Sequence, residues 1–462
     1  MKARREKDAL GYVKVDSGAY YGTDTQRGIG IFKVSGIKVS AELVHHYAIV
    51  KKSAALANFH AGKLDGRRAK AIAKACDYVA QGMLDGQFPL DVFQAGAGTS
   101  TNMNVNEVIA NKAIEILGGR KGDYSIVHPN DHVNMSQSTN DTYPTAVNMT
   151  CYDLTAKRLL PAMRSLERSL RAKEKEFSGI IKTGRTHLQD AVPMRLGSEF
   201  GAYAGAVSRC MESLRLSMDR LLEVPIGGTA VGTGINAGKA YTDNVTRELS
   251  RELGVRIRRD RREFTAMSFR LDQLGLANSL DECAIAFTKT ANDLRLLASG
   301  PRAGLNEILL PAVMPGSSIM PGKVNPSVAE MLNMVCYEVM GNVHSIRSAV
   351  AGAQLELNVF TPVISYKLIS SIGMLANAVR IFDVHCVRGI KANKAAIQEH
   401  LGMDLELATA LNQYIGYAKA AEVEKAAMKE GKSIKQVCLE RNILDEKTLD
   451  RILDPVRESG MA

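Results

Sequence analysis

The chain has 462 residues, of which 45% are apolar and 23% are charged, and its formal net charge is +10. This composition is that of a folded globular protein, and the length predicts two or three domains. No apolar run reaches the ~18 to 20 residues of a membrane helix, and no apolar segment follows the charged N-terminus, so we expect a cytoplasmic protein without a membrane partner.

The spacing of cysteine and histidine does not favour disulfides or a metal centre. The seven cysteines form no C-x-x-C pair, so we expect reduced structural thiols. We expect no histidine pair to hold a metal on a helix, and we therefore predict neither a metal nor an organic cofactor.

The predicted elements begin with a strand over 11–15 (GYVKV) and continue as helices. The chain has only 13 prolines, and residues 226–300 and 363–454 contain none. Such stretches, with apolar residues at steps of three, four and seven, predict long helices. We expect helices over 142–176, 196–222, 271–298, 326–349 and 364–390. The fold class is therefore mainly α with a central bundle of long helices, and their long buried faces predict an oligomer.

Two further segments are interpreted as structural. The segment GGTAVGTG at 227–234 lacks the G-x-G-x-x-G spacing and a preceding strand, so it is predicted to be a turn between helices. Five arginines lie within 256–262, but Asp260 and Glu263 are interleaved with them, so we expect a solvated surface and no nucleic-acid partner. A mildly basic protein also attracts small anions.

Four segments between the helices are dense in short hydroxyl and amide side chains. They are GAGTSTNMN (96–104), SQSTND (136–141), GRTHLQD (184–190) and GSSIMPGKVNP (316–326). Functional residues concentrate in such connections. Together these segments offer many neutral donors, one imidazole and one ammonium, a set that suits a small anion with several carboxylate oxygens.

In this order, the four segments resemble the aspartase/fumarase superfamily, whose signature loop is matched in full by GSSIMPGKVNP. The resemblance implies a three-domain fold with a central bundle of long helices. The implied parts are an N-terminal lyase domain (1–139), a central helical bundle (140–395) and a small C-terminal helical domain (396–462). It also implies a homotetramer with a multi-helix core, in which three subunits build each active site.

The reaction implied by the resemblance is a reversible elimination across a Cα–Cβ bond of a small dicarboxylate, which gives fumarate without a cofactor. In that reaction Ser317 is the general base, and His187 is paired with Glu330. We expect Thr99, Ser138, Thr139 and the backbone amide of Ser318 to bind the β-carboxylate, Lys323 and Asn325 to bind the α-carboxylate, and Asn140, Thr186 and His187 to lie at the leaving amine. The segment VHPND implies a second, non-catalytic anion site at His128, Asn130 and Asp131.

The motifs divide between two branches of the superfamily. GAGTSTNMN and QSTND resemble aspartate ammonia-lyases, whereas VHPND is the form common in class II fumarate hydratases. We therefore expect L-aspartate as the substrate, with the fumarate/L-malate reaction as the alternative. The segment 264–275 and Gln413 depart from both patterns.

Other interpretations of these residues remain. One alternative is that Ser317 is a covalent nucleophile, but the G-x-S-x-G elbow that is typical of such serines does not surround it. An ordinary helix start explains Asn325 and Pro326 but not the two serines and the lysine. His187 alone is more typical of a structural histidine, and the short hydroxyl residues also suit turns and helix caps. A catalytically silent helical scaffold would keep the same loop.

Overall fold

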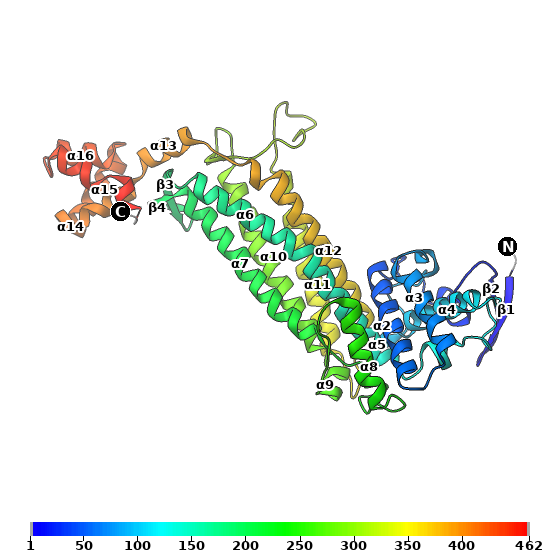
Figure 1. The fold of residues 1–462 in the computed structure, drawn as a ribbon. Coiled ribbons are helices and arrows are strands. Elements are labelled where there is room, and N and C mark those ends of the chain that lie inside the picture. Colours follow the sequence, from blue (N-terminus) through cyan, green and yellow to red (C-terminus); the bar gives the residue numbers. More distant parts are fainter. Residues whose placement is uncertain (1–2, 460–462) are drawn as a thin grey trace. The chain divides into compact units, whose positions relative to one another are not determined.

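The computed structural model describes residues 3–459, and Figure 1 shows their arrangement as mostly helices. The chain divides into two compact units, each discontinuous in sequence. The first contains Met1–Leu160, Glu212–Ala284 and Tyr337–Leu375, and the second contains Pro161–Met211, Ile285–Cys336 and Ala376–Ala462.

The first unit begins with an antiparallel hairpin of β1 (Ala3–Asp8) and β2 (Gly11–Asp16). Its helices are α1 (Thr23–Ile31), α2 (Ala41–His60), α3 (Gly66–Ala80), α4 (Thr99–Ile116), α5 (Thr139–Leu154), α8 (Lys239–Leu253) and α9 (Glu263–Ser268). Shorter elements are η1 (Asp85–Gln87), η2 (Gly96–Gly98), η3 (Pro129–Val133), η4 (Thr155–Leu159) and the parallel pair β5 (Glu223–Val224) and β6 (Arg258–Arg259). Helix α2 is central to this unit because it packs against α3, α5 and α8.

The second unit combines a hairpin, β3 (Ile181–Thr186) and β4 (Gln189–Arg195), with C-terminal helices. Its other elements are α6 (Leu160–Glu176), β7 (Ile308–Leu309), η5 (Val387–Gly389), β8 (Lys391–Ala392), α13 (Lys394–Met403), η6 (Leu405–Leu411), α14 (Asn412–Ile415), α15 (Tyr417–Glu430), α16 (Ile434–Glu440), α17 (Glu446–Ile452) and α18 (Pro455–Glu458). Strand β3 packs against α13, and β4 packs against η6 and α18. The C-terminal helices therefore support the hairpin.

Four long helices supply residues to both units: α7 (Leu196–Leu221), α10 (Leu271–Leu297), α11 (Ser327–Ala351) and α12 (Thr361–His385). The prediction of a mainly helical fold with long central helices is confirmed. The helix predicted over 142–176 is instead three successive elements, α5, η4 and α6, because a π-helical turn separates the two α-helices. In α10 the predicted face is buried at Leu280, Phe287 and Leu294, but Leu271 is 53% exposed.

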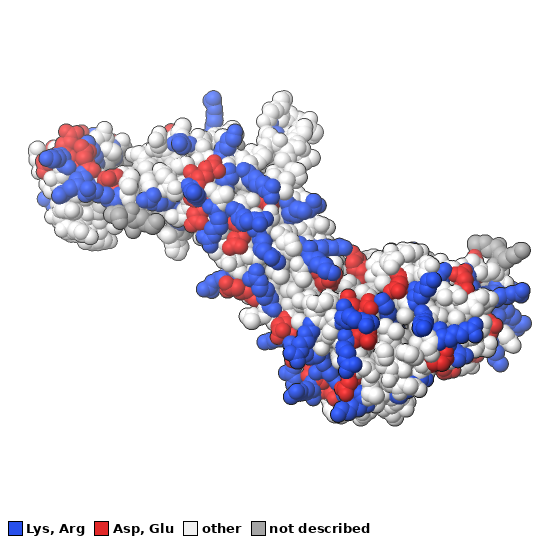
Figure 2. Space-filling view, viewed as in Figure 1, with Lys and Arg blue, Asp and Glu red and all other residues white. Residues whose placement is uncertain are grey.

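The arginines of 256–262 make several ion pairs. Arg258 pairs with Glu223, Arg259 pairs with Glu263, and Arg262 pairs with Asp260. Figure 2 shows basic and acidic side chains interspersed over the face in view. These ion pairs neutralise part of the basic charge that the sequence concentrates in this segment.

All seven cysteines are buried, and no disulfide joins any of them within residues 3–459. One helical stretch, Thr361–Gly389, is long and apolar enough to cross a membrane by length and composition alone. However, 61% of its apolar window is buried inside the molecule, as in a helix of a protein core.

Candidate active site

The N-terminus of α5 holds three of the predicted substrate-binding residues in a fixed geometry. Ser138 is the N-cap, and it forms a capping box with Asp141: the Ser138 N–H donates to Oδ1 of Asp141 over 3.0 Å. Oδ2 of Asp141 accepts the N–H groups of Gly227 (2.9 Å) and Thr229 (3.0 Å). Burial raises the pKa of Asp141 to about 6, and these three donors act in the opposite direction.

The glycine-rich turn at 227–234 is part of the same site, a role that the sequence analysis did not predict. In addition to the bonds to Asp141, the Asn140 side-chain amide donates to the carbonyl of Ala230 over 2.7 Å. The turn at 227–234 and the N-terminus of α5 therefore form two walls of one cavity. The signal in sequence was only its glycine content, which is common to many turns.

A cavity of about 560 Å³ lies between these walls. Ser138 and Thr139 line it together with Asn130 and Asp131, so the structure brings residues of the predicted substrate site and of the predicted second anion site to one cavity. Among its lining residues Asp131 is the only charged one; the others are amides, hydroxyls and apolar groups. Such a cavity offers many hydrogen bonds and no direct cation.

His128 and His132 are spaced H-x-x-x-H, a spacing that can hold a metal on a helix and that the expectation of no such histidine pair overlooked. His128 is the N-cap of η3 and His132 lies in its last turn, where Nδ1 of His132 accepts the His128 N–H over 2.7 Å. Nδ1 of His128 accepts the N–H groups of Asn130 and Asp131, both over 3.2 Å. With Nδ1 accepting, each neutral ring carries its proton on Nε2. Among residues 3–459 no three His, Cys, Asp or Glu side chains group as metal ligands.

Thr99 begins α4 and is exposed, and its hydroxyl donates to the Gly96 carbonyl over 3.1 Å. The turn before it is tightly constrained. Ala97 has φ +59° and donates its N–H to the Val359 carbonyl over 2.8 Å, and Gly98 has φ +85°. A Cβ added to Gly98 would overlap the ring of the buried Tyr143.

We expect Gly98→Ala to lower the free energy of unfolding by about 1 to 3 kcal/mol more than Gly118→Ala does. The two glycines flank α4 with nearly equal φ, +85° and +84°, but a Cβ at Gly118 meets nothing within 4 Å. The backbone strain is therefore matched, and only the clash with Tyr143 differs. Urea unfolding of both variants measures the difference, and equal losses would contradict the packing argument.

Thr186 and His187 lie at the tip of the hairpin in the second unit. Thr186 pairs with Gln189, and the two residues between them have φ +55° at His187 and +61° at Leu188. Positive φ at both central positions is the geometry of a type I′ turn, which non-glycine residues adopt at some cost. The imidazole is exposed.

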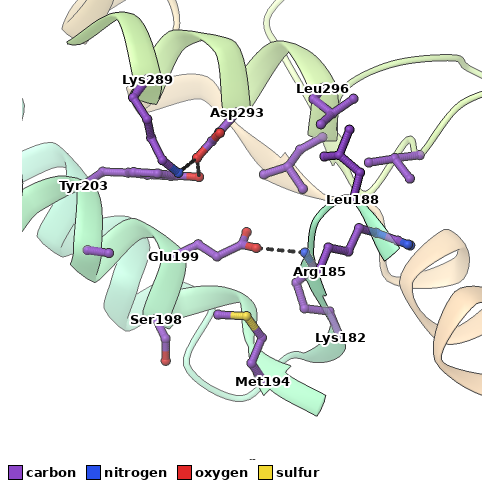
Figure 3. Close-up of a pocket in the computed structure, with 13 residues that line it drawn as sticks. Lys182, Arg185, Leu188, Met194, Ser198, Glu199, Tyr203, Lys289, Asp293 and Leu296 are labelled. Carbon is purple, nitrogen blue, oxygen red and sulfur yellow. Dashed lines mark hydrogen bonds and ion pairs between the residues drawn. The ribbon is translucent and has the colours of Figure 1, made fainter. Parts of the chain in front are cut away.

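Beneath the hairpin, a buried ion-pair cluster fixes the strand that leads to this tip. Nζ of Lys182 lies 2.8 Å from Glu199 and 2.8 Å from Glu307. Arg185 and His400 also contact Glu307, at 3.5 and 3.2 Å. Figure 3 shows Glu199 facing a cavity of about 270 Å³ whose other labelled residues include Tyr203, Lys289, Asp293 and Leu188.

Ser317 and Lys323 line a third cavity, of about 380 Å³, inside the signature loop. Oγ of Ser317 accepts the backbone N–H groups of Ile319 (3.2 Å) and Met320 (2.9 Å). Two donors on one hydroxyl oxygen stabilise its alkoxide form. The loop is closed at its base by a bond of 2.9 Å from the Gly316 N–H to the Lys323 carbonyl.

The remaining predicted residues lie around this loop. Ser318 is exposed on it. The Asn325 side chain donates to the Gly316 carbonyl over 2.5 Å, so in this structure it secures the base of the loop. Glu330 is in the first turn of α11, and among residues 3–459 no hydrogen bond or ion pair joins it to His187.

Comparison with known proteins shows which family of proteins the chain is similar to. Residues 11–341 match the family described as Lyase, and residues 407–457 match Fumarase C C-terminus. An aspartate ammonia-lyase from a Bacillus species is 44% identical over 98% of this chain and 96% of its own. A class II fumarate hydratase from Helicobacter pylori is 44% identical over 100% and 99%. The crystal structure of recombinant class II fumarase from Schistosoma mansoni is 37% identical, with a TM-score of 0.97 over 99% of both chains.

Proposed function

The chain belongs to the superfamily of lyases that contains aspartate ammonia-lyases and class II fumarate hydratases, and from this premise we propose that it is an aspartate ammonia-lyase. It removes ammonia from L-aspartate reversibly and gives fumarate. The observation that supports this chemistry best is the pair of backbone N–H groups on Oγ of Ser317. Those donors favour the alkoxide that a serine base requires.

The proposed reaction begins when Ser317 takes a proton from the carbon beside the β-carboxylate. The resulting intermediate carries two negative charges on that carboxylate and needs donors that are placed beforehand. We assign this role to Thr99, Ser138 and Thr139 with the Ser318 amide. Lys323 holds the α-carboxylate as a point charge, and elimination of the amine from Cα completes the double bond of fumarate.

We further propose that the protein is a cytoplasmic homotetramer in which three subunits contribute to each site. Support comes from large apolar side chains that are exposed on the long helices of the single chain, such as Leu216 (73%), Ile285 (57%) and Met334 (63%). Exposed apolar residues on long helices favour association with further helices. Light scattering on the purified protein tests the tetramer, and a monomeric mass would contradict it.

The second candidate function is that of a class II fumarate hydratase. A specific observation favours it: relatives named aspartate ammonia-lyase and relatives named class II fumarate hydratase are equally similar, at 44% identity. The carboxylate sites and the base are common to both reactions, so the leaving group decides between them.

The deciding experiment offers L-aspartate and L-malate separately and follows the absorbance of fumarate. We expect fumarate and equimolar ammonia from aspartate, and no fumarate from malate. Rapid hydration of fumarate, with no ammonia released from aspartate, would overturn the assignment in favour of the hydratase.

Thr139→Ser is expected to reduce turnover of aspartate without creating a good hydratase. Thr139 lines the cavity, and one methyl group in a pocket discriminates by only about 1 to 3 kcal/mol. Steady-state rates with both substrates measure the effect. Thr229→Ser removes the same group from the opposite wall and is the matched control. A Thr139→Ser enzyme that prefers malate would show that this methyl group alone selects the substrate.

A further inference from the structure

The cavity beside Ser138 and Thr139 presents a problem of charge. Under the proposed function it receives a carboxylate, yet its one charged lining residue is Asp131. The ammonium of Lys63 bonds to the lining residues Ser136 and Asn236 but is not itself a lining residue. A buried cation does lie directly behind three of the lining residues. It is Lys51, in the middle of α2, with 0% exposure.

The hydrogen-bond partners of Lys51 fit its charged form. Nζ donates to Oδ1 of Asn102 (2.7 Å), Oδ1 of Asn134 (2.9 Å) and Oε1 of Gln137 (3.0 Å). A neutral amine has two N–H groups and would direct its lone pair at one of these oxygens, whereas an ammonium has three. Burial lowers the pKa of Lys51 to about 7, and the charge of Asp141 acts in the opposite direction.

An ammonium only donates, so it orients every amide around it. The three oxygens turn toward Lys51, and the NH₂ groups must find other acceptors. The NH₂ group of Asn102 donates to Oδ1 of Asn134, and the NH₂ group of Asn134 donates to the backbone carbonyl of Gln137, both over 3.3 Å. That of Gln137 donates to two backbone carbonyls of the same segment, at 2.9 and 3.1 Å. The network ends at the residue before Ser138.

The neighbouring Lys52 differs from Lys51 in the groups that surround its ammonium. Its Nζ lies 2.9 Å from both Asp77 and Glu252, so two carboxylates neutralise its charge. The hydrogen bonds of Lys51 go to neutral amides, and the charge of Asp141 acts on it without a direct ion pair. In a buried setting with a low dielectric, such a charge acts over a longer distance than at the surface.

We propose that Lys51 is a positioning residue for the lyase reaction. Its buried ammonium fixes the amide wall of the cavity and supplies the positive charge that a bound carboxylate meets, without touching the substrate. The inference rests on the proposed function, because it takes the ligand of this cavity to be a C4 dicarboxylate.

The test compares Lys51→Met and Lys51→Gln with the control Lys52→Met, using calorimetric binding of two ligands. Succinate carries two carboxylates, and succinamate has one of them replaced by an amide. For both Lys51 variants we expect the Kd of succinate to rise roughly tenfold and that of succinamate by less than about threefold. Lys52→Met should change neither.

Several outcomes separate a charge effect from a packing effect. Equal losses for both ligands, with a lower melting temperature, would mean that Lys51 only supports the fold, and unchanged succinate binding would remove it from the site. Lys51→Gln keeps an N–H donor and loses the charge, so it carries the test if Lys51→Met does not fold. Wild-type protein that turns over neither aspartate nor malate contradicts the proposed function, while the succinate comparison still decides the role of Lys51.

Discussion

Ser317→Ala is expected to lower kcat for aspartate by roughly 10² to 10⁴-fold, the usual contribution of a general base, while the protein stays folded. Two backbone N–H groups converge on Oγ of Ser317, and a methyl group gives them nothing to bind. The residue is on a loop and is only half-buried, so its loss removes no core contact. Steady-state kinetics together with a melting curve measure both effects.

The matched control is Ser318→Ala, one position along the same loop. Ser318 is exposed, and its expected contribution comes from the backbone amide, which alanine keeps. We therefore expect this variant to retain most of the wild-type rate. If Ser317→Ala keeps more than about a tenth of the rate, or if both variants lose the same amount, Ser317 is not the base.

Lys323→Ala is expected to raise KM for aspartate by roughly 10 to 150-fold, because a hydrogen bond to a charged group contributes about 1.5 to 3 kcal/mol. Lys323 lines the same cavity as Ser317. Its side chain is exposed and makes no hydrogen bond or ion pair within residues 3–459. Its ammonium is thus available to a carboxylate. Initial rates over a range of aspartate concentrations separate KM from kcat.

The control for this variant is Lys391→Ala, which removes an exposed lysine of β8 in the same unit. It changes the net charge equally, so any general effect of charge on the attraction of the substrate appears in both variants. Unchanged KM and kcat in Lys323→Ala would exclude Lys323 from the site.

Several features of the fold and the site are predictable from sequence because their causes are local. The long helices follow from apolar spacing and the absence of proline, and the cap at Ser138 follows from the S-x-x-D pattern that ends at Asp141. The hydroxyl-rich segments mark the places where cavities form. The family resemblance then connects those segments, although it does not distinguish between two equally similar branches.

Other features depend on contacts between distant residues and have no local signal. Asp141 binds the turn at Gly227 and Thr229, which are 86 and 88 residues further along the chain. Lys51 and Lys52 are adjacent and alike in sequence, yet one is buried among amides and the other is paired near the surface. The difference arises because successive residues of a helix point in different directions.

The interleaved composition of the first unit has a consequence for the order in which the protein matures on the ribosome. The hydroxyl of Tyr143 bonds with Ser365, which is 222 residues later in the chain, and Ala97 bonds with Val359. At a synthesis rate of about 5 to 20 residues per second, Ser365 is synthesised roughly 10 to 45 s after Tyr143. Until Val359 is synthesised, the turn before Thr99 lacks the bond from Ala97 that holds it in the folded unit, and a chaperone can bind the segment during that interval.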